Sequence, residues 1–226
     1  STHILDIYAY CGMSSVSELA DGGSIKDRIN HRGPNMNILS NLERLVIASQ
    51  VAEALADVHR GKIVHADVMI DQFILKSGVY KLNDFNRCVF VYHNSSQPSK
   101  SESCPYHFQD DNAWLFRSPE EYSYTLLTEK IDIYSMGNVF YTLLQEELPF
   151  KDINEQNGTG FVQKLVRRGI RPSLKPTAEE SGDPFLKVII KAMKMCWKQH
   201  PENRPSAHNV RDYLLKEIDR LNAVNA

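Results

Sequence analysis

The sequence predicts a mainly α-helical domain that carries one short β-hairpin. Apolar residues recur at helical spacing from Ser40 to Arg60, which is typical of an amphipathic helix packed on a core. Residues 129–141 are apolar almost all round, which predicts a helix buried on every side. Between these two helices, short apolar runs on either side of Gly78 predict two strands joined by a tight turn.

The composition is that of an ordinary globular domain. The chain has 226 residues, 42% of them hydrophobic and 24% charged, with a formal net charge of −2. This small charge argues against nucleic acid or an anionic membrane as partner, and no apolar run approaches the roughly 18 residues that cross a bilayer. The cysteines show no paired spacing, so we expect reduced, mostly buried thiols in a cytoplasmic protein. They are Cys11, Cys88, Cys104 and Cys196.

The N-terminal stretch is predicted to form two strands and a turn. Residues 2–11 and 13–20 are rich in β-branched and aromatic side chains. Asp21-Gly22-Gly23 breaks the second strand, and Ser24 can cap the short helix that follows.

The predicted helices have start and stop signals of their own. Ser40 and Glu43 fit a capping box at the start of the long helix, and Gly61 can end it. Its buried face is expected to comprise Leu42, Leu45, Ala48, Ala52, Leu55 and Val58. Further helices are predicted over residues 162–168 and 184–197, and Ser206 can cap a last one with Val210, Leu214, Ile218 and Leu221 on one face.

Two carboxylates are expected to face one cleft at the centre of the chain. Residues 73–75 and 79–82 form the predicted strands, and the turn folds them into a ribbon. Asp67 lies just before this ribbon and Asp84 just after it, so both belong near its open end. One carboxylate can accept a proton from a nucleophile while the other holds a divalent metal on a phosphate.

These residues resemble the catalytic loop and the metal-binding motif of the protein kinase superfamily. The family has His-Arg-Asp-Leu-x-x-x-Asn followed by Asp-Phe-Gly. This chain has His65-Ala66-Asp67-Val68-Met69-Ile70-Asp71-Gln72, then Asp84-Phe85-Asn86. Further similarities occur in the family's order: a hinge-like strand and acidic residue followed by Gly22-Gly23, Ser118-Pro119-Glu120 for Ala-Pro-Glu, a buried helix with Asp132, and Cys196-Trp197 before Arg204-Pro205-Ser206. The Cys196-Trp197 and Arg204-Pro205-Ser206 pieces resemble the tyrosine-kinase-like branch of the family more than its other branches.

The resemblance implies a role for each matching residue. Asp67 would be the catalytic residue, Asp84 the main Mg²⁺ ligand and Gln72 the second metal ligand. ATP would contact the backbone of Glu18 and Ala20 through its adenine, and Ser24, Ile74 and Asp84 elsewhere. Structural roles would fall to His65, Phe85, Glu120, Asp132 and Arg204, with Asp132 holding the catalytic loop and Glu120 paired with Arg204.

Four departures from the family's pattern bear on activity. Ala66 replaces the Arg that usually meets a phosphorylated activation segment, so dependence on phosphorylation of residues 88–116, with Ser95, Ser96, Ser99, Ser101 and Ser103, is not expected. Met69 stands where many kinases have Lys. Gln72 replaces the metal-binding Asn with a longer side chain. Asn86 replaces Gly, and the turn is expected to persist because Asn tolerates positive φ.

The resemblance also implies a domain division and leaves two functions open. Residues 1–20 would be the last strands of the N-terminal lobe and the hinge, and residues 21–226 the helical C-terminal lobe. The 226 residues contain no Gly-x-Gly-x-x-Gly and no Val-Ala-x-Lys, so they are expected to be inactive alone. The intact protein would transfer the γ-phosphate of ATP to a Ser, Thr or Tyr hydroxyl of a protein. The alternative is a pseudokinase that binds nucleotide or protein as a scaffold.

Overall fold

The computed structural model describes residues 1–12, 14–30, 39–91, 106, 115–175 and 181–225. Over this part the chain is mainly helical, and its sheets have two strands each. The helices are α1 (Ile25–Asn30), α2 (Asn41–Arg60), α3 (Pro119–Tyr122), α4 (Lys130–Gln145), α5 (Lys151–Asn157), α6 (Thr159–Arg167), α8 (Pro184–Cys196) and α9 (Ala207–Asn225). The strands are β1 (Ile7–Cys11), β2 (Ser14–Ser17), β3 (Ile63–Val64), β4 (Phe73–Lys76), β5 (Val79–Leu82) and β6 (Val89–Phe90), and the 3₁₀ turns are η1 (Ile70–Gln72), η2 (Phe85–Arg87) and η3 (Pro201–Asn203).

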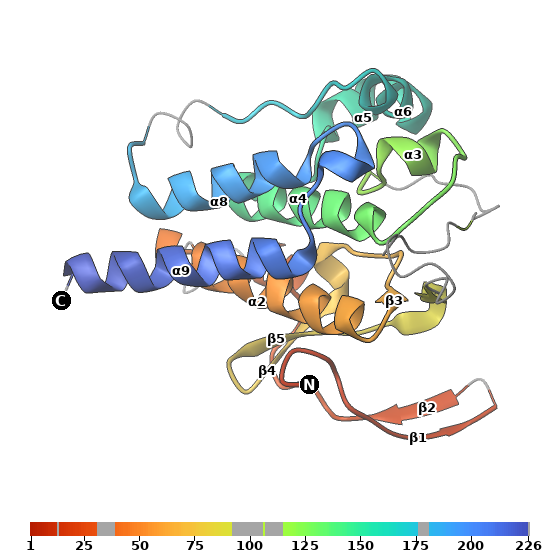
Figure 1. Ribbon diagram of the computed structural model, residues 1–226, viewed down its shortest axis with the longest axis vertical. Coiled ribbons are helices and arrows are strands. Elements are labelled where there is room, and N and C mark those ends of the chain that lie inside the picture. Colours follow the sequence, from red (N-terminus) through yellow and green to blue (C-terminus); the bar gives the residue numbers. More distant parts are fainter. Residues whose placement is uncertain (13, 31–38, 92–105, 107–114, 176–180, 226) are drawn as a thin grey trace, which may run out of the picture.

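Helix α4 lies at the centre of the molecule (Figure 1). It packs against α8 and α2, and α2 in turn packs against α9. Nearly all of its residues are buried, including the polar Asp132 and Asn138, which agrees with the prediction of a helix apolar almost all round. Through Asp132, this helix holds the loop of the site described below.

The tight α4–α8 contact depends on a residue without a side chain. A Cβ atom at Gly137 would lie 2.7 Å from Trp197 Cδ1 and 3.0 Å from Cys196 Cβ. Gly137→Ala is therefore expected to destabilise the protein by about 1–3 kcal/mol through overpacking, measured by urea unfolding. The matched control is Gly160→Ala in α6, where a Cβ meets nothing within 4 Å; it should stabilise the helix by about 0.5–1 kcal/mol. Equal effects of the two substitutions would contradict this account.

Helix α2 begins and ends where the capping signals predicted. The Ser40 hydroxyl accepts a hydrogen bond from Glu43 N, the Glu43 carboxylate accepts one from Ser40 N at 2.9 Å, and Gly61 is the C-cap. The expected burial of Leu42 is wrong, since its side chain is 44% exposed. It belongs to the first turn of the helix, where Glu43 is exposed as well.

The expectation of mostly buried cysteines is also wrong for the described residues. Cys196 is buried, but Cys88 is only partly covered and Cys11 is exposed. Cys11 ends a strand that faces solvent along its length, and Cys88 follows the surface turn η2. Cys104 lies outside the described residues.

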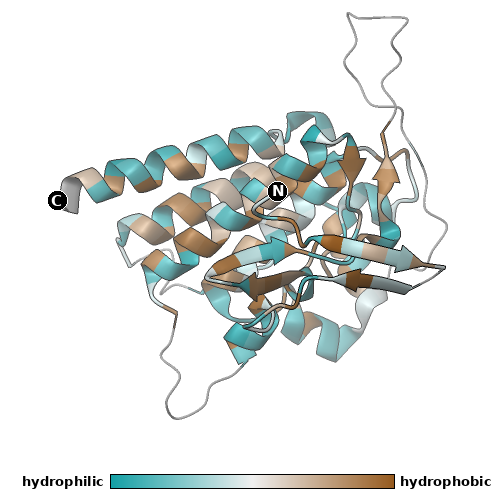
Figure 2. Cartoon of the chain, turned by 90° about the horizontal axis from the view of Figure 1, so that it is seen from below, coloured by the Kyte–Doolittle hydropathy of each residue, from teal (hydrophilic) through white to brown (hydrophobic). Residues whose placement is uncertain are grey.

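The N-terminal strands are shorter than predicted and form an exposed hairpin. β1 and β2 pair antiparallel, while Leu5, just before β1, bonds instead to Leu82 of β5 at 3.0 Å. This competing contact ends the hairpin early. Its apolar side chains face solvent, with Tyr8 at 69% and Tyr10 at 85% exposure, and Figure 2 shows hydrophobic colouring along it. Met13 of the predicted second strand lies outside the described residues.

Among the helices that the structure describes, none combines the length and the hydrophobicity that crossing a bilayer requires.

Candidate functional site

The β4–β5 ribbon brings two distant site residues to one place. Its turn consists of Ser77 and Gly78, both with positive φ, and Phe73 pairs with Leu82 at the open end. One step beyond this pair, Asn83 N donates to Gln72 O at 2.8 Å. Gln72, just before the first strand, and Asp84, which follows Asn83 after the second strand, therefore lie side by side at the open end of the ribbon.

Asp67, Gln72 and Asp84 form one cluster at this open end. The Gln72 amide nitrogen donates to Asp67 Oδ2 at 3.2 Å and to Asp84 Oδ2 at 3.3 Å. The two carboxylates thus face each other across a single buried amide group, in the arrangement that the ribbon predicted. Two carboxylates and an amide are oxygen donors of the kind that Mg²⁺ prefers, so this residue set fits a magnesium ion.

Asp132 of α4 holds the loop that carries Asp67. Its Oδ2 accepts a hydrogen bond from His65 N and its Oδ1 one from Ala66 N, both at 2.8 Å, and His59 Nε2 lies 2.9 Å from Oδ2. Ala66 has a φ of 61°, which is unusual for a residue with a side chain. The two bonds to a fully buried carboxylate stabilise this strained backbone.

His65 and Phe85 connect the two carboxylate-bearing segments. His65 Nε2 lies 2.9 Å from Asn83 O, and Asp67 N donates to His65 Nδ1 at 3.3 Å. The tautomer with its proton on Nε2 satisfies both contacts. The His65 ring meets the Phe85 ring edge-on at 5.0 Å, so the loop and the ribbon end are held in register.

The left-handed residue of the Asp84-Phe85-Asn86 turn is not the one expected. Asp84 has a φ of 60°, whereas Asn86 is absent from the described residues with positive φ and lies within the 3₁₀ turn η2. The expectation that Asn86 keeps the turn through positive φ is therefore wrong. The positive φ lies two residues earlier, at Asp84, so a residue without glycine's conformational freedom is tolerated at position 86.

The structure adds a cation to the site that sequence reasoning missed. Arg117, just before Ser118-Pro119-Glu120, donates from Nη2 to Asp67 Oδ1 at 2.7 Å and from Nη1 to Ala66 O at 2.6 Å. Its side chain is 3% exposed. A signal was present, since an arginine placed next to Leu115 and Phe116 must be paired if it is buried, but the sequence does not show which acid pairs with it.

The hinge residues lie along β4. Asp21 N and Gly22 N donate to Leu75 O, Leu75 N donates to Gly23 O at 2.8 Å, and Ser24 forms a β-bridge with Ile74. Ser24 and Ile74 are thus adjacent, and Lys81, the cross-strand partner of Ile74, reaches the Glu18 carboxylate.

The Glu18 amide already donates to Asp6 O at 2.9 Å. Of the two backbone groups of Glu18, the carbonyl oxygen is therefore the one that could bind a nucleotide. Ala20, two residues on, is half-buried.

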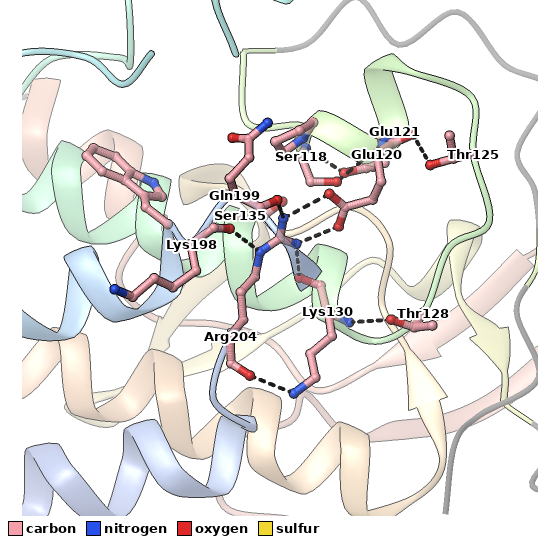
Figure 3. A network of polar contacts seen from close by, with 12 residues as sticks. Ser118, Glu120, Glu121, Thr125, Thr128, Lys130, Ser135, Lys198, Gln199 and Arg204 are labelled. Atoms are coloured by element: carbon pink, nitrogen blue, oxygen red, sulfur yellow. Dashed lines mark hydrogen bonds and ion pairs between the residues drawn. The ribbon is translucent and has the colours of Figure 1, made fainter. Parts of the chain in front are cut away.

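Glu120 and Arg204 form a buried ion pair (Figure 3). Arg204 Nη2 donates to Glu120 Oε2 at 2.9 Å, and Nη1 donates to Oε1 and to Lys130 O. The Nε group of Arg204 donates to Lys198 O at 2.8 Å. This pair ties the segment after α8 to α3, whose N-cap, Ser118, follows directly after Arg117.

Glu121, next to this pair, gives the fold an unusual pH dependence. Burial raises its pKa to about 7, against the opposing influence of Arg117. Between its unfolded pKa and pH 7 the folded state then holds more protons than the unfolded state, so stability falls as pH rises through this window. The slope from this group is at most about 1.4 kcal/mol per pH unit.

Glu121→Gln is expected to remove that slope. The free energy of unfolding of the variant, measured from about pH 5 to about pH 8, should fall less steeply than that of the wild type. Glu155→Gln, at an exposed position of α5, is the control and should leave the slope unchanged. Parallel curves for wild type and Glu121→Gln would show that the buried carboxyl does not titrate in this range.

Of the phosphorylatable residues of the segment 88–116, the structure describes Tyr106, which is partly buried and forms a β-bridge with Leu127. Ser95, Ser96, Ser99, Ser101, Ser103 and Tyr92 lie outside the described residues.

Comparison with known proteins decides the family. The model of the protein kinase domain matches residues 4–214. The chain belongs to the protein kinase family. It is 26% identical over 199 residues to the probable serine/threonine-protein kinase gdt4 of Dictyostelium discoideum, covering 85% of this chain and 11% of that protein.

The relatives of this protein kinase domain include both serine/threonine-protein kinases and a tyrosine-protein kinase. It is 24% identical over 219 residues to tyrosine-protein kinase SRK3 of Spongilla lacustris, covering 94% of this chain and 59% of that protein. With relatives of both kinds, the branch within the family is unresolved. The chain spans less than two thirds of the length of either relative.

Proposed function

We propose that this domain, in the protein at its full natural length, transfers the γ-phosphate of ATP to a hydroxyl group of a protein substrate. The observation that supports it is the placement of Asp67 and Asp84 on either side of the Gln72 amide, within hydrogen-bond reach of it. Phosphoryl transfer needs a group that orients the attacking hydroxyl and a group that holds a metal on the phosphates.

The residues divide this chemistry as follows. The substrate hydroxyl attacks phosphorus, the bond from the γ-phosphorus to the ADP oxygen breaks, and Asp67 orients the hydroxyl and accepts its proton. Asp84 and the Gln72 amide oxygen would hold Mg²⁺, which neutralises charge on the phosphates. Glu18, Ala20, Ser24 and Ile74 would line the nucleotide side, along β4.

A cavity beside the catalytic loop supports a protein substrate. It has a volume of about 290 Å³ and is lined partly by Met69, Ile70 and Phe116. It therefore lies beside the loop that carries Asp67 and beside the end of the segment 88–116. A pocket of this size takes an amino-acid side chain adjacent to the acceptor residue.

A scaffold without phosphotransfer is the second candidate. Gln72 offers N–H groups, not its oxygen, to both carboxylates, and so fills the place of a cation between them. A domain closed in this way would bind nucleotide or protein without turning ATP over.

One experiment separates the two candidates. The full natural-length protein is incubated with radiolabelled ATP and a mixed protein substrate, with Mg²⁺ or with a chelator, and nucleotide binding is measured in parallel. Mg²⁺-dependent labelling supports the enzyme, and phosphoamino acid analysis then identifies Ser, Thr or Tyr. Nucleotide binding without labelling, in wild type and in Gln72→Asn alike, would exclude the enzyme.

A further inference from the structure

Arg117 contacts two consecutive groups of the catalytic loop at once. Nη1 donates to the Ala66 carbonyl oxygen at 2.6 Å and Nη2 to Asp67 Oδ1 at 2.7 Å. A planar guanidinium can do this because its two terminal nitrogens are fixed in a fork. A lysine ammonium, being a single point of charge, could not hold both oxygens in the same geometry.

These contacts complete a clamp on both groups. The Ala66 backbone, strained at a φ of 61°, is held through its N–H by Asp132 and through its carbonyl by Arg117. The Asp67 carboxylate is held at Oδ2 by Gln72 and at Oδ1 by Arg117. Asp67 therefore has both oxygens fixed, and of its two side-chain donors in the described part of the chain, Arg117 is the one that carries a positive charge.

Arg117 has no stronger competing partner among the described residues. The nearest other carboxylate oxygen is Glu121 Oε1, 3.7 Å from Nη1, and burial raises the pKa of Glu121. The Nε group of Arg117 is buried and without a hydrogen-bond partner in the described part of the chain. A fully buried guanidinium with one donor unsatisfied is costly, so the contacts to the loop must outweigh this cost.

We propose that Arg117 is the positioning residue of Asp67, and that it supplies from the far end of the segment 88–116 the cation that is missing at position 69. Many kinases have a lysine there, two residues after the catalytic aspartate, and this chain has Met69. This inference rests on the proposed phosphotransfer. It adds that the competence of Asp67 depends on a residue 50 positions away in the sequence, at the start of the Ser118-Pro119-Glu120 element.

The test compares Arg117→Lys and Arg117→Met in the full natural-length protein. Both are expected to lower kcat, by about tenfold for Lys and a hundredfold for Met, in line with losing part or all of one charge-assisted contact. The KM for ATP should stay within about twofold, since the hydrogen bonds of Arg117 go to Ala66 and Asp67 and not to the residues proposed to line the nucleotide side. The control is Arg211→Met, whose exposed guanidinium pairs with the adjacent Asp212, and it should keep the wild-type kcat.

Rescue distinguishes positioning from a merely structural role. Adding Met69→Lys to Arg117→Met should recover kcat at least tenfold, because a cation is returned next to Asp67 from the other side. Wild-type kcat in Arg117→Met would overturn the inference, and so would a loss that Met69→Lys fails to restore.

A second readout keeps the inference testable if the protein transfers no phosphate. Unfolding midpoints are measured for Asp67→Asn, Arg117→Lys and the double variant. A double variant that loses less than the sum of the two single variants shows the Asp67–Arg117 coupling independently of activity. Additive losses would overturn the inference, whereas a catalytically silent wild type would overturn the proposed function alone.

Discussion

Asp67→Asn is expected to lower the rate of phosphate transfer about 10²–10⁴-fold, the range attributed to a positioned proton acceptor. The asparagine keeps the shape and can still accept a hydrogen bond from Arg117, but it cannot take the proton of the substrate hydroxyl. Nucleotide binding should change little, because Glu18, Ser24 and Ile74, which would line the nucleotide side, are unchanged in the variant.

The measurement is kcat of the full natural-length protein with saturating Mg²⁺-ATP. Asp219→Asn, at an exposed position of α9, removes the same charge elsewhere and should retain full activity. A variant at position 67 with more than about a tenth of the wild-type rate would assign proton transfer to another group.

Arg204→Met is expected to lower the free energy of unfolding by about 3–5 kcal/mol. The substitution leaves the Glu120 carboxylate buried without its partner and deprives the carbonyl groups of Lys130 and Lys198 of a donor. The lost packing of the guanidinium on the Tyr134 ring, 5.1 Å away, adds to this.

Chemical unfolding of the double variant identifies the cause. Adding Glu120→Gln to Arg204→Met removes the unpaired charge and should recover part of the loss. Arg211→Met, at the exposed pair on α9, should change stability by no more than about 0.5 kcal/mol. An Arg204→Met protein as stable as that control would mean that the ion pair contributes nothing to the fold.

Features set by neighbouring residues could be predicted from the sequence. The capping box of α2, the turn at Gly78 and the apolar pattern of α4 are local, so a short stretch of sequence carries the whole physical cause. The ribbon also implied that Asp67 and Asp84 would meet, because the length of a hairpin determines where its two ends lie. The Glu120–Arg204 contact was expected only through the family resemblance.

Features that depend on tertiary contacts could not be predicted in this way. The partner of Arg117 lies 50 residues away, and no pattern around position 117 identifies it. The first strand begins only at Ile7 because Leu5 bonds to β5, and the positive φ falls on Asp84, not Asn86, because Asp84 is the N-cap of η2. In each case a contact made in the folded molecule outweighs a local preference.

The attachment of the loop to α4 has a consequence for how the protein can lose function. The amides of His65 and Ala66 end on a carboxylate at the centre of the core, so they cannot be released by fraying at the surface. The catalytic residues therefore lose their arrangement only when the whole domain unfolds. Warming or a core mutation should leave that arrangement intact until the domain unfolds cooperatively.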